Sequence, residues 1–460
     1  MSFDALPKSI AQNSILFVQG DELDSDRARV FVGQAWRAQQ KMLRDRKFWS
    51  QQKKDEYALG KLAEIVDFAF ENVPMYRELY SRVGYRPGDL KTFADYERLP
   101  SIDKAFLRDV SEADRVARRV LTDREGLNKS TTSGSSGVPF TILFDEDSLL
   151  IDNLANFRMF DLMSKSGLTC DDWLYNVHHI RAWLPRLDDG LPTFTLNHIE
   201  CAADLAQHLL QLRPKVFSVL PSYLHICREQ PDMFRAAGVE VIVTNSEASS
   251  LTERRFYSQL FGVPVLDEYS SEEVGLMAYE CEHRRYHLEF DFVHTSFVAT
   301  AQEGVFRLNS TDLVSRTMPF IKFDHGDLVS IGGRQDDICA CGQCGPYIVS
   351  LNGRKDDAIV RPDGGLVPSA VLSNLVDTHF NANVLGISGF QLIQQKDPAQ
   401  FEFLYEAPTA LSDTHDLFRG FAQDLDRYVG HKTQLTFTWV AKIPAGKSYK
   451  RKKVLSLNHQ

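Results

Sequence analysis

The hydrophobic pattern predicts helices in the first quarter of the chain. Apolar residues recur there at the i, i+3, i+4, i+7 and i+8 spacing that places side chains on one face of a helix. The positions that share this face are Leu62, Ile65, Val66, Ala69 and Phe70. Pro74, Pro87 and Pro100 then interrupt the segment. We therefore expect residues 25–110 to form a mainly helical lead-in.

Between residues 130 and 330, short apolar runs alternate with helical stretches, which predicts an α/β arrangement. In one unit, Val239–Thr244 is expected to be a buried strand and Pro264–Tyr269 the next strand. The segment between them is expected to be a helix that begins at a Thr252 cap and ends at Gly262. This order predicts parallel strands, with ligands bound at their carboxyl ends.

The pattern changes after Gly353. Phe401–Tyr405 and Leu435–Val440 alternate as strands, and Asp413–Tyr428 has a helical period. Roughly a hundred residues of such material can form a small domain. We therefore expect two domains, with the boundary near residue 353.

Composition narrows the class of protein. Hydrophobic residues make up 43% of the chain and charged residues 25%, a balance that excludes wholesale disorder. The net charge is −10 and no long basic stripe is present, so we expect no nucleic-acid partner. The N-terminus lacks a basic segment followed by an apolar one, and no apolar run reaches about 18 residues. We expect a cytoplasmic protein with no membrane partner.

The cysteines favour metal binding over disulfides. Seven is an odd number for a disulfide framework, and three of the seven stand alone in the sequence. The other four fall between Cys281 and Cys344, with His287 nearby. Thiolates together with an imidazole are typical of tetrahedral structural zinc. Reduced cysteines without a metal are the alternative.

A serine- and glycine-rich segment is the first candidate for binding chemistry. Residues 131–139 read Thr-Thr-Ser-Gly-Ser-Ser-Gly-Val-Pro and precede the apolar stretch Phe140–Phe144. Two glycines allow a tight turn in which backbone N–H groups and hydroxyls face one anion. A plain flexible turn is the alternative, and the segment lacks the Gly-Lys-Ser/Thr ending of a Walker loop.

Further motifs follow this loop in order along the chain. They are Asp267–Tyr269 with Glu273, Thr311–Leu313 with Met318–Pro319, Gly326–Asp327, Gly353–Asp357 and Gly446–Lys447. Together the motifs resemble the adenylate-forming superfamily of acyl-CoA ligases, over roughly residues 60–455. Asn72–Arg77 and Leu99–Pro100 are similar to the phenylacetate-CoA ligase branch, which includes coenzyme F390 synthetase-like and CapK-like proteins.

The resemblance implies a fold and a two-step reaction. It implies an α/β fold with a large N-terminal domain (residues 1–352) of mixed and parallel sheets, which binds ATP and an acid. A small, mobile α+β lid domain (residues 353–460) follows. Such enzymes form an acyl-adenylate with release of pyrophosphate and then transfer the acyl group to a thiol. ATP, Mg²⁺ and CoA are the implied cofactors, and a small carboxylic acid is the substrate.

The resemblance also implies roles for single residues. The implied nucleotide contacts are Ser133, Gly134, Ser135, Ser136 and Gly137 at phosphate, Ser246, Glu247, Asp267 and Tyr269 around adenine, Ser271 near the α-phosphate, Asp327 at the ribose, and Arg354 near the ribose or a phosphate. Glu273 matches the glutamate that binds Mg²⁺. Lys447 matches the catalytic lysine that bridges the substrate carboxylate and the α-phosphate, where charge builds up. The alternatives are a core aromatic role for Tyr269 and a solubilising tail around Lys447 and Lys450.

The chain departs from the family pattern at three positions, which are Val138, Glu272 and Ser270, the last in place of a usual glycine. Val138 stands where many members have lysine, so backbone dipoles or Mg²⁺ must compensate for the lost cation. Glu272 stands where Ser or Thr is usual beside the α-phosphate. A carboxylate there is unfavourable unless metal or a cation shields it, which leaves Ser271 to supply the hydroxyl.

The same branch often carries a Cys…His pair followed by Cys-x-Cys-Gly. In this chain the pattern implies zinc ligands at Cys281, His287, Cys339 and Cys341, with His283 and Cys344 as spare candidates. The implied ion fastens the loop before the second domain and takes no part in catalysis.

Several functional alternatives stay open at this point. The acyl acceptor can be an amine or a carrier-protein thiol instead of CoA, or the chain can be a non-catalytic nucleotide-binding relative. The acyl pocket is expected around residues 175–185 and 221–223, where Arg181 either pairs with a second acidic group of the substrate or faces solvent. A homodimer is a further alternative to a monomer.

Overall fold

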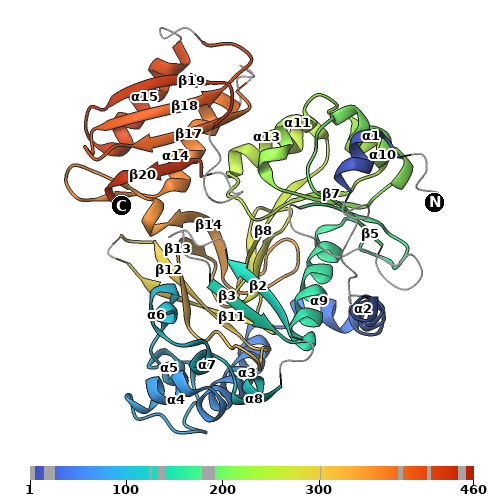
Figure 1. Cartoon of the computed structure of the whole chain (residues 1–460), viewed down its shortest axis with the longest axis vertical. Helices are drawn as coiled ribbons and strands as arrows, with labels where there is room; N and C mark the ends of the chain where they lie inside the picture. The colour runs from blue at the N-terminus through green and yellow to red at the C-terminus, as the bar shows by residue number, and fades with distance from the viewer. Residues whose placement is uncertain are drawn as a thin grey trace.

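The structure is a computed structural model, in which two lobes are joined along one side (Figure 1). It describes residues 6–14, 26–123, 127–132, 140–178, 192–300, 302–381, 387–411, 416–443 and 452–459. One hydrophobic core is built only from residues between Ile359 and Val454, and three others lie in the preceding part of the chain. Following the division expected from the sequence, we name residues 6–352 the N-terminal lobe and residues 353–459 the C-terminal lobe.

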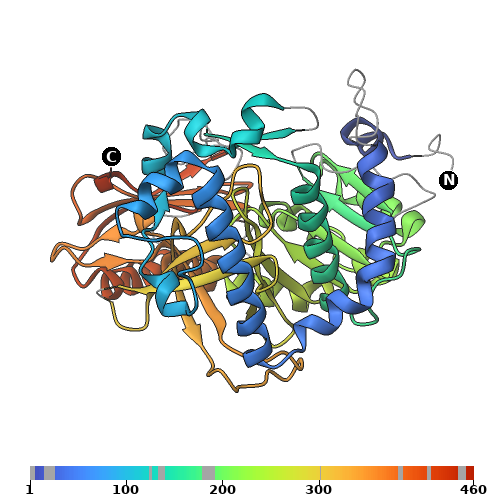
Figure 2. The same ribbon diagram turned by 90° about the horizontal axis from the view of Figure 1, so that it is seen from below.

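The predicted helical lead-in is confirmed. Its described helices are α2 (Asp26–Lys47), α3 (Gln51–Asn72), α4 (Pro74–Ser81), α5 (Phe93–Glu97) and α6 (Lys104–Asp109), and α7 (Glu112–Arg115) and α8 (Arg118–Thr122) follow the predicted segment. The predicted apolar face of α3 is inward, because Leu62 and Ile65 are fully buried. Pro74 occupies the first turn of α4, where its missing N–H costs nothing. Helix α2 packs against α9 (Glu146–Met163) (Figure 2).

The N-terminal lobe is organised around one large mixed sheet, which confirms the α/β fold class. Its parallel strands are β5 (Thr193–Leu196), β4 (Leu174–Val177), β6 (Val216–Val219), β7 (Val241–Thr244) and β8 (Val265–Ser271), in that spatial order. The antiparallel strands continue from β8 as β9 (Gly275–Glu280), β10 (Tyr286–Leu288), β14 (Tyr347–Arg354), β13 (Phe323–Gly332), β12 (Phe306–Asp312) and β11 (Val293–Ala299). Strand β8 therefore borders both kinds of pairing.

Helices cover both faces of the parallel strands. Alternate side chains of one strand enter different cores, as Ile242 and Val243 of β7 do. The remaining helices of the lobe are α1 (Lys8–Asn13), α10 (Ala202–Leu212), α11 (Leu224–Cys227), α12 (Met233–Ala237) and α13 (Leu251–Phe261). None of the helices in the described ranges is both long and apolar enough to cross a bilayer.

The β7–α13–β8 unit confirms the predicted parallel pairing and corrects the predicted cap. Ser250, not Thr252, caps α13, because its hydroxyl accepts a hydrogen bond from the backbone N–H of Glu253 at 3.0 Å. Thr252 is the second residue of the helix, and its hydroxyl donates to Asn374 of the C-terminal lobe. Gly262 ends the helix at φ 64°, as expected.

Among its described residues, the C-terminal lobe contains a four-stranded sheet and two α-helices. The strands run in the order β19 (Gln434–Val440), β18 (Gln400–Glu406), β17 (Gly389–Gln394) and β20 (Val454–Ser456). The helices are α14 (Ser369–Val376) and α15 (Asp416–Val429), and a short pair, β15 (Ile359–Val360) and β16 (Leu366–Val367), lies beside them. The two strands and the helix predicted here from the sequence pattern are confirmed.

A strand pairing and a hydrogen bond join the helical lead-in to the antiparallel strands. Strand β1 (Ile102–Asp103) pairs in parallel with β13, so that Asp103 lies opposite Asp324. The Tyr76 hydroxyl donates to the backbone carbonyl of Pro319 at 3.0 Å. This pairing fixes the start of α6, and with it Lys104, against the sheet.

Candidate nucleotide and metal sites

Three of the predicted nucleotide contacts meet in one cluster. Tyr269 lies on β8, Asp327 on β13 and Arg354 at the end of β14. The Tyr269 hydroxyl donates to one oxygen of Asp327 at 2.6 Å, and Arg354 Nε donates to the other at 3.1 Å. The Asp327 side chain keeps 16% of its surface exposed, so a ligand can still reach the carboxylate. The cluster offers an acceptor and a cation at the carboxyl end of β8.

Another predicted residue, Glu273, forms an ion pair with a lysine that the sequence analysis did not identify. Lys104 Nζ lies 2.8 Å from Glu273 Oε1, and the glutamate is only 4% exposed. Burial alone would raise the pKa of Glu273, but Lys104 and His325 outweigh it and lower the pKa. The side chain is therefore a carboxylate at neutral pH, the form that a divalent cation requires.

The two residues before Glu273 differ in their contacts. The buried hydroxyl of Ser271 has no hydrogen-bond partner among the described residues. Glu272 is exposed, and its Oε2 accepts a hydrogen bond from Ser130 of β2 (Asn128–Thr132) at 2.8 Å. Strand β2 pairs with β3 (Phe140–Phe144), so Glu272 contacts the hairpin that flanks the serine-glycine segment.

The end of β7 brings Ser246 and Glu247 to the same edge of the sheet. Ser246 has a left-handed backbone with φ 61°, which reverses the chain directly after the strand. Glu247 Oε2 accepts from the backbone N–H of Ser222 at 3.1 Å. The segment expected at the acyl pocket, residues 221–223, therefore lies beside the residues expected at adenine.

Asp267 is buried, and its carboxylate accepts hydrogen bonds from neighbouring side chains. Its Oδ1 accepts from Thr244 and Ser249, and its Oδ2 accepts from Tyr286 at 2.7 Å. Burial raises the pKa of Asp267, and Arg254 opposes that shift. A direct contact of Asp267 with adenine stays a prediction.

Two further carboxyls lie close to this edge. Burial raises the pKa of Asp152 on α9 to about 7 and that of Glu268 on β8 to about 8. A Cβ atom on Gly275 would lie 2.5 Å from Asp152 Oδ1, and Gly275 has φ 75°, so only glycine fits at that position. Protonation of these carboxyls reduces the negative charge that an anionic ligand meets near neutral pH.

The four predicted zinc ligands are brought together. The ligand atoms of Cys281, His287, Cys339 and Cys341 all lie within 4.8 Å of one another. The Cys281 and Cys339 sulfurs are 3.8 Å apart, and Cys341 Sγ is 3.1 Å from His287 Nε2. Two thiolates bound at about 2.3 Å to a tetrahedral ion would also be about 3.8 Å apart, so the donor set fits zinc.

The two spare candidates lie elsewhere. Cys344 Sγ donates to the backbone carbonyl of Trp49 at 2.9 Å, and the side chain of His283 is 40% exposed beside Glu282. The group of four connects the β9–β10 turn to residues 339–341, which precede β14 and hence Arg354.

The remaining predicted residues lie outside the described part of the chain. These are Ser133, Gly134, Ser135, Ser136, Gly137, Val138, Arg181, Lys447 and Lys450. Their roles stay predictions.

The structure adds Lys104 and His325 to the site. His325 precedes Gly326–Asp327 in a motif that the sequence analysis used, so proximity in the chain could have indicated it. Lys104 carries no such local signal. It reaches Glu273 because β1 pairs with β13, a contact between segments far apart in the sequence.

Comparisons with known proteins find two relatives that share one name. No protein-family model matches the chain. The phenylacetate-coenzyme A ligase of Thermus thermophilus is 23% identical over 334 residues, which is 68% of this chain and 72% of the relative. The enzyme of the same name from Escherichia coli is 30% identical over 226 residues, 45% of this chain and 48% of the relative.

Solved structures of a 2-hydroxyisobutyryl-CoA ligase share the fold. In its postadenylation state with 2-HIB-AMP, that ligase matches 88% of this chain with a TM-score of 0.71 at 20% identity, and 90% of its own chain is covered. In its thioesterification state with 2-HIB-AMP and CoA, the coverage and identity are the same, but the TM-score is 0.55. The chain as a whole therefore superposes more closely on the first of these states.

Proposed function

We propose that this chain, which is similar to two phenylacetate-coenzyme A ligases and shares the fold of a 2-hydroxyisobutyryl-CoA ligase, is an adenylate-forming acyl-CoA ligase that joins a small carboxylic acid to CoA at the expense of ATP. The first step forms an acyl-adenylate and releases pyrophosphate. In the second step the CoA thiol attacks the acyl carbon and AMP leaves. The observation that carries the proposal is the convergence of Tyr269, Asp327 and Arg354 beside the Glu273–Lys104 pair.

The ribose and the adenine are assigned to two strand ends. Asp327 has two oxygens and so can accept hydrogen bonds from both ribose hydroxyls, in exchange for its contacts with Tyr269 and Arg354. Arg354 then remains close enough to meet the ribose or a phosphate. Ser246 and Glu247 line the adenine edge in this proposal, and Asp267 supports them from below.

The phosphates are assigned to the region around Glu273. Its carboxylate would hold Mg²⁺, which offsets the negative charge of the triphosphate when bound. The Ser271 hydroxyl has no hydrogen-bond partner in the described ranges, which supports a hydrogen bond from this residue to the α-phosphate. Lys104 supplies a nearby cation in a chain that has Val138 in place of the usual lysine, while Ser133–Gly137 and Lys447 keep their predicted roles.

We assign Cys281, His287, Cys339 and Cys341 to one structural zinc ion. Four protein ligands leave no position for substrate, so the ion would stabilise the fold and take no part in the reaction. Cys281, Cys339 and His287 are buried, which shields these ligand atoms from solvent, and Cys341 is partly buried. Reduced thiols also suit the cytoplasm, the location that we propose.

The decisive experiment is a pyrophosphate-exchange screen against aryl, amino and aliphatic acids. An acid that supports exchange identifies the substrate class, and mass spectrometry with CoA present should then detect the acyl-CoA. Exchange without any acyl-CoA would favour the alternative acceptor, an amine or a carrier-protein thiol. ATP binding without exchange for any acid would contradict the proposal in favour of a non-catalytic relative. A homodimer stays a prediction, which light scattering tests.

A further inference from the structure

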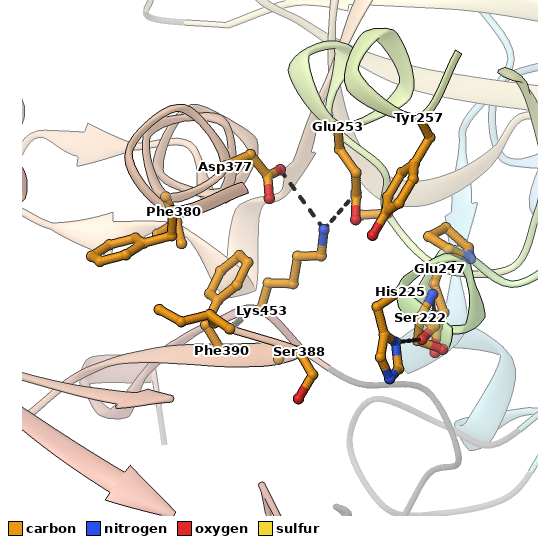
Figure 3. A pocket seen from close by; sticks show the side chains of 15 residues that line it. Ser222, His225, Glu247, Glu253, Tyr257, Asp377, Phe380, Ser388, Phe390 and Lys453 are labelled. Carbon is orange, nitrogen blue, oxygen red and sulfur yellow. Dashed lines mark hydrogen bonds and ion pairs between the residues drawn. The ribbon is translucent and has the colours of Figure 1, made fainter. Parts of the chain in front are cut away.

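The two lobes touch along a defined seam. Helix α13 of the N-terminal lobe contacts α14 and the π-helical turn η5 (Asp377–Asn381) of the C-terminal lobe. The Thr252 hydroxyl donates to Asn374 Oδ1 across this seam at 2.7 Å. A small pocket opens along it, lined by residues of both lobes (Figure 3).

One lysine lies between a carboxylate of each lobe at this seam. Lys453 Nζ is 2.7 Å from Glu253 Oε2 on α13 and 3.8 Å from Asp377 Oδ2 on η5 (Figure 3). The lysine side chain is 19% exposed, the glutamate 8%, and the aspartate not at all. Phe390 lies against the ammonium, with 5.4 Å from the nitrogen to the ring centre. The Lys453–Glu253 pair is thus a largely desolvated charge contact between the lobes.

Glu253 and Asp377 differ in whether they stay close to Lys453 when the lobes move relative to each other. Asp377 and Lys453 belong to the same lobe. The backbone carbonyl of Lys453 accepts a hydrogen bond from the backbone N–H of Leu392 in β17. A rotation of the C-terminal lobe therefore leaves the Lys453–Asp377 contact in place and separates Lys453 from Glu253. The lysine keeps one partner throughout, which lowers the cost of breaking the contact with Glu253.

The lobe arrangement indicates which step this contact favours. Among structures of one ligase, aligned over the same 88% of this chain, the postadenylation state matches with a TM-score of 0.71 and the thioesterification state with 0.55. The Lys453–Glu253 pair is present in the arrangement that resembles the first state. A contact made in only one of two states shifts the population toward that state.

We propose that Lys453 is a positioning residue, which holds the C-terminal lobe in the adenylation arrangement through Glu253 and releases it before thioester formation. This inference rests on the proposed two-step function. It assigns a role to one of the basic residues that follow Lys447, which the sequence alone could not distinguish from solvent-facing lysines.

The test measures the two half-reactions separately in the full-length enzyme. Pyrophosphate exchange reports adenylation, and thioester formation from supplied acyl-AMP and CoA reports the second step. We expect Lys453→Met and Glu253→Gln each to lower the exchange kcat by about ten-fold, because a smaller fraction of the enzyme occupies the competent arrangement. The KM for ATP should change less than three-fold, and the second half-reaction should be unchanged or faster.

Two control variants separate positioning from general loss of structure. Lys452→Met removes the neighbouring lysine, which pairs with Asp357 of the same lobe at 2.7 Å, and should leave both half-reactions within two-fold. The reversed pair Glu253→Lys with Lys453→Glu should recover part of the lost exchange. Equal losses in both half-reactions, or normal exchange in Lys453→Met, would overturn the inference.

A readout without catalysis distinguishes this inference from the proposed function. Cysteines introduced at Thr252 and Asn374 should form a disulfide across the seam under mild oxidation, and peptide mapping identifies the bond. We expect Lys453→Met to slow this cross-link several-fold and Lys452→Met to leave it unchanged. If the wild type exchanges no pyrophosphate, the function fails. If the cross-linking rate does not depend on Lys453, the positioning role fails.

Discussion

Asp327 and Arg354 lie directly opposite each other on adjacent antiparallel strands and form an ion pair, with 3.1 Å between Oδ1 and Nε. Arg354 is also the last residue of β14 and the second residue of the C-terminal lobe. A carboxylate assigned to the ribose is therefore bonded to the residue at the junction of the lobes. Nucleotide binding at Asp327 would change the contacts of that junction directly.

We expect Asp327→Asn to weaken ATP binding by roughly ten- to a hundred-fold, because an amide replaces a charged acceptor of two hydrogen bonds. Isothermal titration calorimetry measures the change in Kd. Asp336→Asn is the matched control, since Asp336 is exposed and should bind ATP as the wild type does. An unchanged Kd in Asp327→Asn would contradict the ribose assignment.

The metal assignment predicts about one zinc ion per purified chain. Cys339→Ser or Cys341→Ser should lose the ion and lower the melting temperature by roughly 5 °C or more, because bound metal stabilises only the folded state. Elemental analysis and thermal melting measure both effects. Cys170→Ser and Cys344→Ser are the controls, since neither sulfur belongs to the group of four. Protein prepared without chelators that holds no metal would refute the site.

Lys447→Ala should abolish pyrophosphate exchange and leave ATP affinity within a few-fold. The ammonium is expected to act mainly on charge that develops at the α-phosphate, so its removal affects the transition state more than the bound ground state. Exchange kinetics and a direct binding assay measure the two quantities. Lys450→Ala is the control for the register of the motif, and loss of exchange in that variant alone would move the role to Lys450.

His208 should make the protein less stable as the pH falls. Burial lowers the pKa of His208 to about 4, whereas an unfolded histidine titrates near 6.5. The unfolded chain therefore binds a proton that the folded chain does not, and stability is lost as the pH falls from about 6.5 to 4. Relative to His208→Gln, the wild type should lose up to about 3 kcal/mol over this window.

Urea unfolding of both proteins at a series of pH values measures that difference. His283→Gln is a control for the loss of an exposed histidine, because the His283 side chain is 40% exposed. A difference between wild type and His208→Gln that does not vary with pH would show that His208 is protonated equally in the folded and unfolded chain.

The sequence pattern predicted the elements whose side chains repeat over many positions. Helix α3, strands β18 and β19 and the parallel β7–β8 pair follow from periodicity alone, because each buries one regular set of apolar residues. The cap of α13 was misplaced by two residues. Ser250 and Thr252 are both good capping residues, and only the backbone conformation distinguishes them.

The candidate site was predictable where its residues lie in ordered motifs. Asp327 and Glu273 were identified in this way. The clustered cysteines indicated metal binding, and the choice of four ligands came from the pattern of the family that the chain resembles. Lys104 and the Lys453–Glu253 pair were not, because both depend on contacts between segments that are distant in the chain. Such contacts leave no periodic trace in the sequence and follow from the tertiary fold alone.

The contact between the helical lead-in and the sheet has a consequence for synthesis on the ribosome. The Tyr76 hydroxyl donates a hydrogen bond to the backbone carbonyl of Pro319, which lies 243 residues later in the chain. At about 5–20 residues per second, the lead-in would wait roughly 12–50 s for its partner to be made. Its apolar side chains stay exposed during that time, so nascent chains should bind holdase chaperones before release. Ribosome-bound chains halted before residue 319 should be more sensitive to protease within the lead-in than chains halted after residue 360.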